Sequence, residues 1–123
     1  MADHILRVTM DPRFSRLLQQ QNDNQLFLFP EGVTGMSPDD LAAYIRTQAF
    51  AAVAEIIEAV DETHWKPWAT RPASEDVIPN RERYKGELAD VFIFLMNLML
   101  AGGITMSDLA DAVSAKQVKN RER

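Results

Sequence analysis

The sequence predicts an all-α protein, and two observations support that prediction. Apolar residues recur at steps of three and four over several long stretches, which is the spacing of a helix that buries one face. The alternation of apolar and polar residues that would indicate strands is nearly absent. At 123 residues the chain has the size of one domain. We expect a single domain over residues 1–123, with an N-terminal arm and short helix in 1–37 and a helical core in 38–123.

The first helix is predicted directly after the N-terminal arm. Asp11 followed by Pro12 is typical of a helix start, because Asp caps free backbone N–H groups and Pro suits the first helical position. The helical spacing continues to about Gln21. Residues 19–24 are all Gln, Asn or Asp, and we interpret them as a solvated helix end or, alternatively, as amides that contact a nucleotide base. Residues 25–36 are expected to form a loop with an apolar plug, or a very short strand.

A long second helix and a long loop follow. Ser37 and Pro38 are a strong helix start, and the apolar spacing predicts a helix from about Pro38 to about Glu62. Residues 63–80 contain three prolines and little periodicity, so they are predicted to form a loop. Long loops inside a small domain are uncommon and often functional.

The third helix should begin between residues 81 and 84 and end at Ala101, before two glycines. Its second half, residues 91–101, is apolar almost all round, so it should be buried on every side. Since a domain of four helices cannot easily enclose such a helix, part of it is expected to meet another subunit. Thr105 and Asp108 form a capping-box pattern that starts a last helix.

Composition and charge exclude several classes of protein. The net charge of −5 and the pI near 4.9 argue against a nucleic-acid binder, which needs a basic face. A small phosphorylated ligand stays possible, because a bound metal can supply positive charge. There is no cysteine, no signal-peptide pattern, and no apolar run long enough to span a membrane. We expect a cytoplasmic protein with neither membrane nor nucleic-acid partners.

Two acidic pairs carry the candidate chemistry. Glu55 and Glu58, like Glu87 and Asp90, stand three residues apart, which places each pair on one helix face. Both pairs interrupt apolar stretches, where unpaired carboxylates are costly to bury. Oxygen ligands suit Mg²⁺ or Mn²⁺, whereas zinc would want His or Cys. A di-iron site is disfavoured, because Asp61-x-x-His64 has no second copy.

A carboxylate-bound Mg²⁺ most often serves phosphates, and side chains to complete a phosphate site are present. The candidates for binding phosphate or sugar are Lys66, Lys85, Lys116 and Asn120. Two alternatives remain open from the residues alone. The chain could bind a nucleotide or a metal without turnover, or it could be a structural helical dimer whose acids are simply solvated.

The acidic pattern resembles the all-α nucleoside triphosphate pyrophosphohydrolases, which include MazG-like proteins and dimeric-type dUTPases. The resemblance covers residues 38–123 and starts from Glu55-x-x-Glu58, a spacer of 28 residues, and Glu87-x-x-Asp90. The segment Trp65-Lys-Pro-Trp68 looks like the Trp-Lys-x-Trp segment of dimeric dUTPases. Gly102-Gly-Ile-Thr-Met106 followed by Lys116-x-x-x-Asn120 looks like the C-terminal signature of the same group.

The resemblance implies a MazG-like four-helix core, packed with other subunits into an oligomeric helical bundle. It also implies Mg²⁺-dependent cleavage of a nucleoside triphosphate to the monophosphate and pyrophosphate. The best substrate expectation is dUTP, with a purine dNTP or dCTP as alternatives. Because the chain is shorter than the longer dimeric dUTPases, a homotetramer built as a dimer of dimers is expected in preference to a homodimer.

The same resemblance implies roles for individual residues. The four carboxylates of the acidic pairs would be the catalytic and metal-binding groups, and Glu55 is favoured as the one that activates water. Trp65 would pack near the base. The base edge would be read by an amide among Gln20, Gln21 and Asn24.

Overall fold

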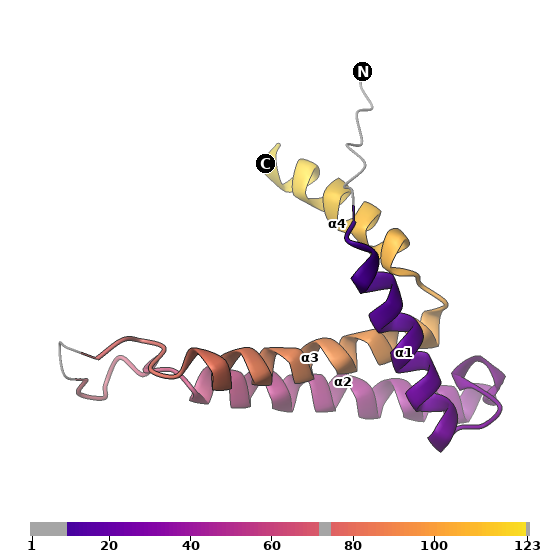
Figure 1. Ribbon diagram of the computed structural model, residues 1–123, viewed down its shortest axis with the longest axis horizontal. Helices are drawn as coiled ribbons and strands as arrows, with labels where there is room; N and C mark the ends of the chain where they lie inside the picture. Colours follow the sequence, from indigo (N-terminus) through magenta and orange to yellow (C-terminus); the bar gives the residue numbers. More distant parts are fainter. Residues whose placement is uncertain (1–9, 72–74, 123) are drawn as a thin grey trace. The chain divides into compact units, whose positions relative to one another are not determined.

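The computed structural model describes residues 10–71 and 75–122, and all regular structure in those ranges is helical. The predicted all-α class is therefore confirmed (Figure 1). The four α-helices and the one short 3₁₀ helix are α1 (Pro12–Leu28), η1 (Val33–Gly35), α2 (Pro38–Asp61), α3 (Arg81–Gly102) and α4 (Met106–Arg121). The expected arm at residues 1–10 lies almost wholly outside the described residues.

The chain divides into two compact units, which are described separately below. The first unit combines Met1–Ser37 with Met99–Arg123, and the second is Pro38–Leu98. The first unit contains α1, η1 and α4, and the second contains α2 and nearly all of α3. Both acidic pairs belong to the second unit.

Helix α1 starts as predicted but runs about two turns further than expected. The Asp11 side chain accepts a hydrogen bond from the backbone N–H of Arg13, and the helix ends at Leu28 instead of near Gln21. Glutamine is a good helix former, and here Gln21 and Gln25 are buried on one face. The polar run was therefore wrongly interpreted as a frayed, solvated end.

The apolar residues after the polar run are likewise helical. Leu26, Phe27 and Leu28 form the last turn of α1, so the predicted loop or short strand over residues 25–36 is wrong for this part. Phe27 is 88% exposed in the described chain, so this turn does not plug a core. After the end of α1, Gly32 adopts φ +79 in the turn that leads into η1.

The first unit packs α1 against α4. Its buried apolar residues are Val33, Met99 and Met106, and Ser114 of α4 is also buried. The capping box predicted at the start of α4 is present, with Thr105 and Asp108 each accepting from the backbone of the other at 3.0 Å.

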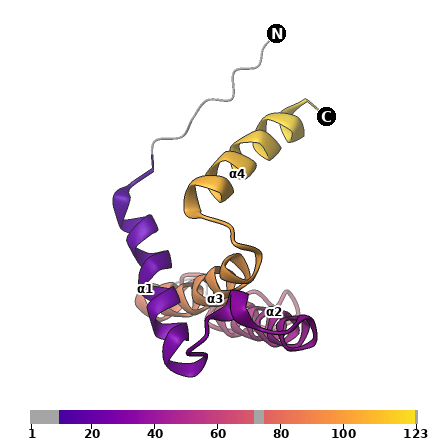
Figure 2. The ribbon, with the colours of Figure 1, turned by 90° about the vertical axis from the view of Figure 1, so that its right-hand side faces the viewer.

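In the second unit, α2 and α3 run antiparallel (Figure 1), and both views of the ribbon show them side by side (Figures 1 and 2). Helix α2 follows its prediction to within one residue. The buried Ala52 and Ala59 have small side chains that let α3 approach closely. Tyr44 of α2 is buried in the same unit, as are Val91 and Met96 of α3.

Helix α3 also matches its predicted bounds. The Asn80 side chain accepts from the backbone N–H of Arg83 at its start. At its end Gly103 adopts φ +65, and the N–H of Ile104 donates to the carbonyl of Met99 at 2.9 Å, which is a Schellman closure. The second half of α3 is not enclosed on every side within this chain, because Ile93 and Leu95 are exposed, and the expected contact with another subunit stays a prediction.

The segment between α2 and α3 is a loop where it is described, as predicted. The backbone N–H of His64 donates to the carbonyl of Val77 at 2.8 Å, which ties the two ends of the loop together. Among the described residues, no single helix is long and apolar enough to cross a membrane, although α3 and α4 together, as a bent pair, pass that test by length and composition.

Candidate metal centre

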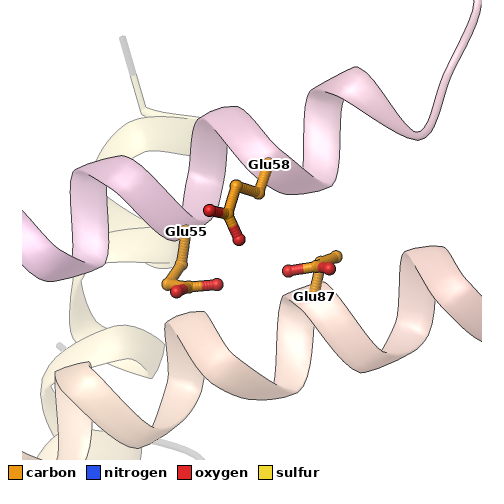
Figure 3. A group of neighbouring side chains, drawn as sticks. All are labelled: Glu55, Glu58 and Glu87. Atoms are coloured by element: carbon orange, nitrogen blue, oxygen red, sulfur yellow. The ribbon is translucent and has the colours of Figure 1, made fainter.

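Three carboxylates converge between the two helices of the second unit. Glu55 and Glu58 extend from α2 toward α3, and Glu87 extends from α3 into the space between them (Figure 3). Each side chain offers one oxygen, and these oxygens all lie within 4.8 Å of one another. The predicted gathering of acidic groups from two helices is thus present for three of the four residues.

The helical geometry explains this gathering. Glu55 and Glu58 are three residues apart on α2, so their side chains emerge from the same face, about one turn apart. Because α3 runs antiparallel on that face, Glu87 meets both of them.

The oxygens of this cluster are poorly provided with partners. One oxygen of Glu55 and one of Glu87 are fully enclosed and have no hydrogen-bond donor. Within residues 10–71 and 75–122, no ion pair joins a basic side chain to Glu55, Glu58 or Glu87. Enclosed carboxylate oxygens without a donor are costly, so the cluster calls for a proton or a cation.

The pKa values of two of these carboxyl groups are raised for the same reason. Burial, and then the negative charges of Glu58 and Asp90, raise the pKa of Glu55 to about 7. Burial and the charge of Glu58 also raise the pKa of Glu87. Near neutral pH the site is therefore poised between holding protons and holding a cation.

Asp90 stands apart from the other three acids. It is exposed and is not a member of the trio whose oxygens converge. Its negative charge nevertheless contributes to the raised pKa of Glu55, so it belongs to the same electrostatic neighbourhood. A ligand role for Asp90 stays a prediction.

The loop after α2 forms a cavity of about 650 Å³, which lies in the same unit as the acids. It is lined by Lys66 and Trp65 together with His64 and Arg71. The Trp65 and Trp68 rings meet edge to face with their centroids 5.5 Å apart, and both remain exposed. The predicted phosphate-binding Lys66 and base-packing Trp65 thus share one cavity.

The other predicted binding residues have different surroundings. Lys85 is exposed and forms an ion pair with Glu82 at 2.7 Å. Lys116 and Asn120 are exposed on α4 and belong to the first unit. Of the amides on α1, Gln21 is buried, whereas Gln20 and Asn24 are exposed. The role of each in binding stays a prediction.

Two polar contacts in the second unit, one between α2 and α3 and one between α3 and the residue that follows α2, were not anticipated from the sequence. Asn97 donates from its side-chain amide to the Gln48 side chain at 2.8 Å, and Arg83 pairs with Glu62 at 3.3 Å. The one signal for the first contact was that Asn97 interrupts an apolar run.

Comparisons with known proteins add no assignment. No protein-family model matches the chain, and the searches of curated proteins and of solved structures returned no match. The resemblance to the all-α pyrophosphohydrolases therefore depends on the residues quoted above.

Proposed function

We propose that this protein is a Mg²⁺-dependent nucleoside triphosphate pyrophosphohydrolase. The observation that carries the proposal is the convergence of Glu55, Glu58 and Glu87 within 4.8 Å, with enclosed oxygens that have no donor. Carboxylate oxygens without basic partners suit a hard divalent cation, with Mn²⁺ as an alternative to Mg²⁺. Asp90 is proposed as the fourth acidic ligand.

When bound, Mg²⁺ supplies the positive charge that phosphate oxygens need and that this acidic chain lacks. Glu55 is proposed to accept a proton from the attacking water. A general base works best when its pKa lies near the working pH, and the pKa of about 7 for Glu55 meets that condition in the metal-free protein.

The remaining substrate contacts are assigned by side-chain chemistry and by the resemblance. Lys66 and Lys85 are proposed to bind phosphate, Trp65 to stack near the base, and Lys116 and Asn120 to bind phosphate or sugar. We propose that the side-chain amide of Gln20, Gln21 or Asn24 forms hydrogen bonds with the edge of the base. We propose dUTP as substrate, with a purine dNTP or dCTP as alternatives, and a cytoplasmic location.

Subunit association is part of the proposal. Phe50, Val53 and Ile57 are exposed at helical spacing on α2, and Phe50 is 72% exposed. An apolar stripe of this kind on a two-helix unit favours association with further helices. We propose a homotetramer built as a dimer of dimers, or otherwise a homodimer with a MazG-like helical core, and light scattering on the purified protein would distinguish these from a monomer.

The activity is tested with a substrate panel. Each common dNTP and NTP, and dUTP, is incubated with protein and Mg²⁺, and pyrophosphate is measured. The proposal expects pyrophosphate from at least one deoxynucleotide and none when EDTA is added. Nucleotide-dependent thermal stabilisation without any product would instead indicate a non-catalytic nucleotide-binding module.

A further inference from the structure

A part-buried hydrogen bond joins a polar side chain of α2 to one that interrupts the apolar second half of α3. The Asn97 amide donates to the Gln48 carbonyl oxygen at 2.8 Å, and Asn97 is only 3% exposed. Its neighbour Met96 is also buried. A part-buried amide pair contributes little net stability compared with apolar packing, so its presence calls for another explanation.

A second polar contact, between Arg83 of α3 and Glu62, the residue directly after α2, fits the same antiparallel register. In the pair of Gln48 with Asn97 the residue numbers add to 145, and in the pair of Glu62 with Arg83 they also add to 145. Two antiparallel helices with equal rise keep this sum constant along their contact. One alignment of α2 against α3 therefore satisfies both contacts.

That alignment also fixes how the acids face each other. Applied between the two contacts, it sets Glu55 opposite Asp90 and Glu58 opposite Glu87. Besides burial, the negative charges of Glu58 and Asp90 both contribute to the raised pKa of Glu55 and to that of Glu87, so the four acids are electrostatic neighbours. Gln48 lies seven residues before Glu55, and Asn97 lies seven after Asp90, so each amide is two turns from an acid on the same face.

Opposed carboxylates repel each other, so the metal-free site itself favours sliding one helix along the other. Apolar burial is not directional, so it specifies the register less sharply than a hydrogen bond between two particular side chains does. A slip by one turn would separate the Gln48 and Asn97 amides and break their hydrogen bond, which is costly because Asn97 is only 3% exposed. The Arg83 side chain is 70% exposed, so its ion pair with Glu62 restrains the register less.

We propose that Gln48 and Asn97 are positioning residues, whose part-buried hydrogen bond sets the register that aligns the acidic residues of α2 and α3. The consequence for metal binding rests on the function proposed above, whereas the register itself does not. Removing both amides in favour of leucine would strengthen apolar packing while releasing the alignment. Stability and metal affinity should then change in opposite directions, which a merely structural role would not produce.

The register is measured by spin-label distances. The chain has no cysteine, so Thr47→Cys on α2 and Arg81→Cys on α3 give two specific labelling sites at exposed positions of the second unit. Labelled protein is diluted with unlabelled protein so that only distances within one chain are read. With Gln48 and Asn97 intact we expect one narrow distance distribution. In Gln48→Leu/Asn97→Leu we expect a broadened or displaced distribution, since one helical turn is about 5.4 Å.

Two further measurements complete the test. The swapped variant Gln48→Asn/Asn97→Gln keeps an amide pair and is expected to retain the narrow distribution. In the double-leucine variant, Mn²⁺ affinity should fall at least tenfold while the melting temperature stays level or rises. A narrow, unshifted distribution in the double-leucine variant would overturn the proposal.

The remaining outcomes are also decisive. If the double-leucine variant does not fold, broadening in the swapped variant would overturn the proposal instead. If intact protein binds no Mn²⁺ but the distances behave as expected, the proposed function fails and the register assignment stands.

Discussion

Glu55 on α2 and Glu87 on α3 approach each other across the helix pair. Each of the two side chains has one buried carboxylate oxygen that accepts no hydrogen bond. Two such groups of the same charge cannot both be ionised there without cost. The site therefore takes up a proton or a cation near neutral pH. The first two predictions follow from that competition.

Metal affinity should depend steeply on pH. Because the pKa of Glu55 is raised to about 7, a proton competes with the cation below neutral pH. We expect Mn²⁺ affinity to fall by up to about tenfold for each pH unit below 7, and binding at pH 7 to release a proton. Calorimetric titrations at pH 6, 7 and 8, each in two buffers of different ionisation enthalpy, measure both effects. Affinity that is equal at pH 6 and pH 8 would contradict the assignment.

Stability without metal should decrease as pH rises. The folded protein keeps a proton on Glu55 up to about pH 7, whereas the unfolded chain releases it near pH 4.5. The folded state thus binds more protons in this window, so the free energy of unfolding falls as pH increases from about 4.5 to about 7. Thermal melts in EDTA measure the trend.

Glu55→Gln should reduce that loss of stability and raise the melting temperature at pH 8. The amide carries no charge at any pH, so the folded state no longer gains or loses a proton at this position. Glu31→Gln makes the same chemical change at an exposed position in the first unit and serves as the control. A melting temperature that rises between pH 5 and pH 7 in the unmodified protein would be inconsistent with the raised pKa.

Glu58→Gln should abolish turnover without unfolding the protein. Glu58 is exposed and one of its oxygens belongs to the converging trio, so its removal affects the site more than the core. Loss of a metal ligand is expected to lower the rate of pyrophosphate release at least ~100-fold. Substitution of residues that only support the ligands usually lowers activity by about 10- to 100-fold. Asp90→Asn tests the fourth proposed ligand in the same assay. If Glu58→Gln and Asp90→Asn both released pyrophosphate as fast as the control variant Glu31→Gln, the proposed roles of these two acids would be refuted.

Thr105→Ala should destabilise α4. The hydroxyl oxygen of Thr105 accepts from the backbone N–H of Asp108, and the Asp108 carboxylate accepts from the backbone N–H of Thr105. Loss of such a cap costs about 1 kcal/mol of unfolding free energy. Thr105→Ser keeps the hydroxyl and should stay close to the unmodified protein in denaturant titrations. Equal stability of the alanine and serine variants would show that the cap contributes nothing.

The sequence predicted the helices best where one signal dominated. Helix α2 has a start signal and a proline-rich loop after it, and α3 has an apolar stretch followed by two glycines, and their bounds match the predictions closely. Helix α1 was predicted too short because the middle of the helix is a polar run, and its second half buries Gln21 and Gln25 while Phe27 is exposed. Burial of glutamine by tertiary contacts is not visible in an apolar pattern.

The candidate site was predictable in part for a similar reason. The spacing within one helix places Glu55 beside Glu58, and the antiparallel hairpin brings Glu87 to them. The periodicity of a single helix does not say which residue of the partner helix lies opposite, so the pairing of Gln48 with Asn97 could not be predicted. The closure of the loop by His64, whose ring nitrogen lies 3.2 Å from Glu75, also needed the folded backbone.

Direct titration with Mn²⁺, followed by its electron paramagnetic resonance signal at pH 8, tests the central claim most directly. The account predicts a saturable site in the unmodified protein that Mg²⁺ displaces. It predicts that this site is lost in Glu55→Gln/Glu87→Gln and retained in Glu31→Gln. Equal Mn²⁺ binding by all three proteins, or none by the unmodified one, would contradict it.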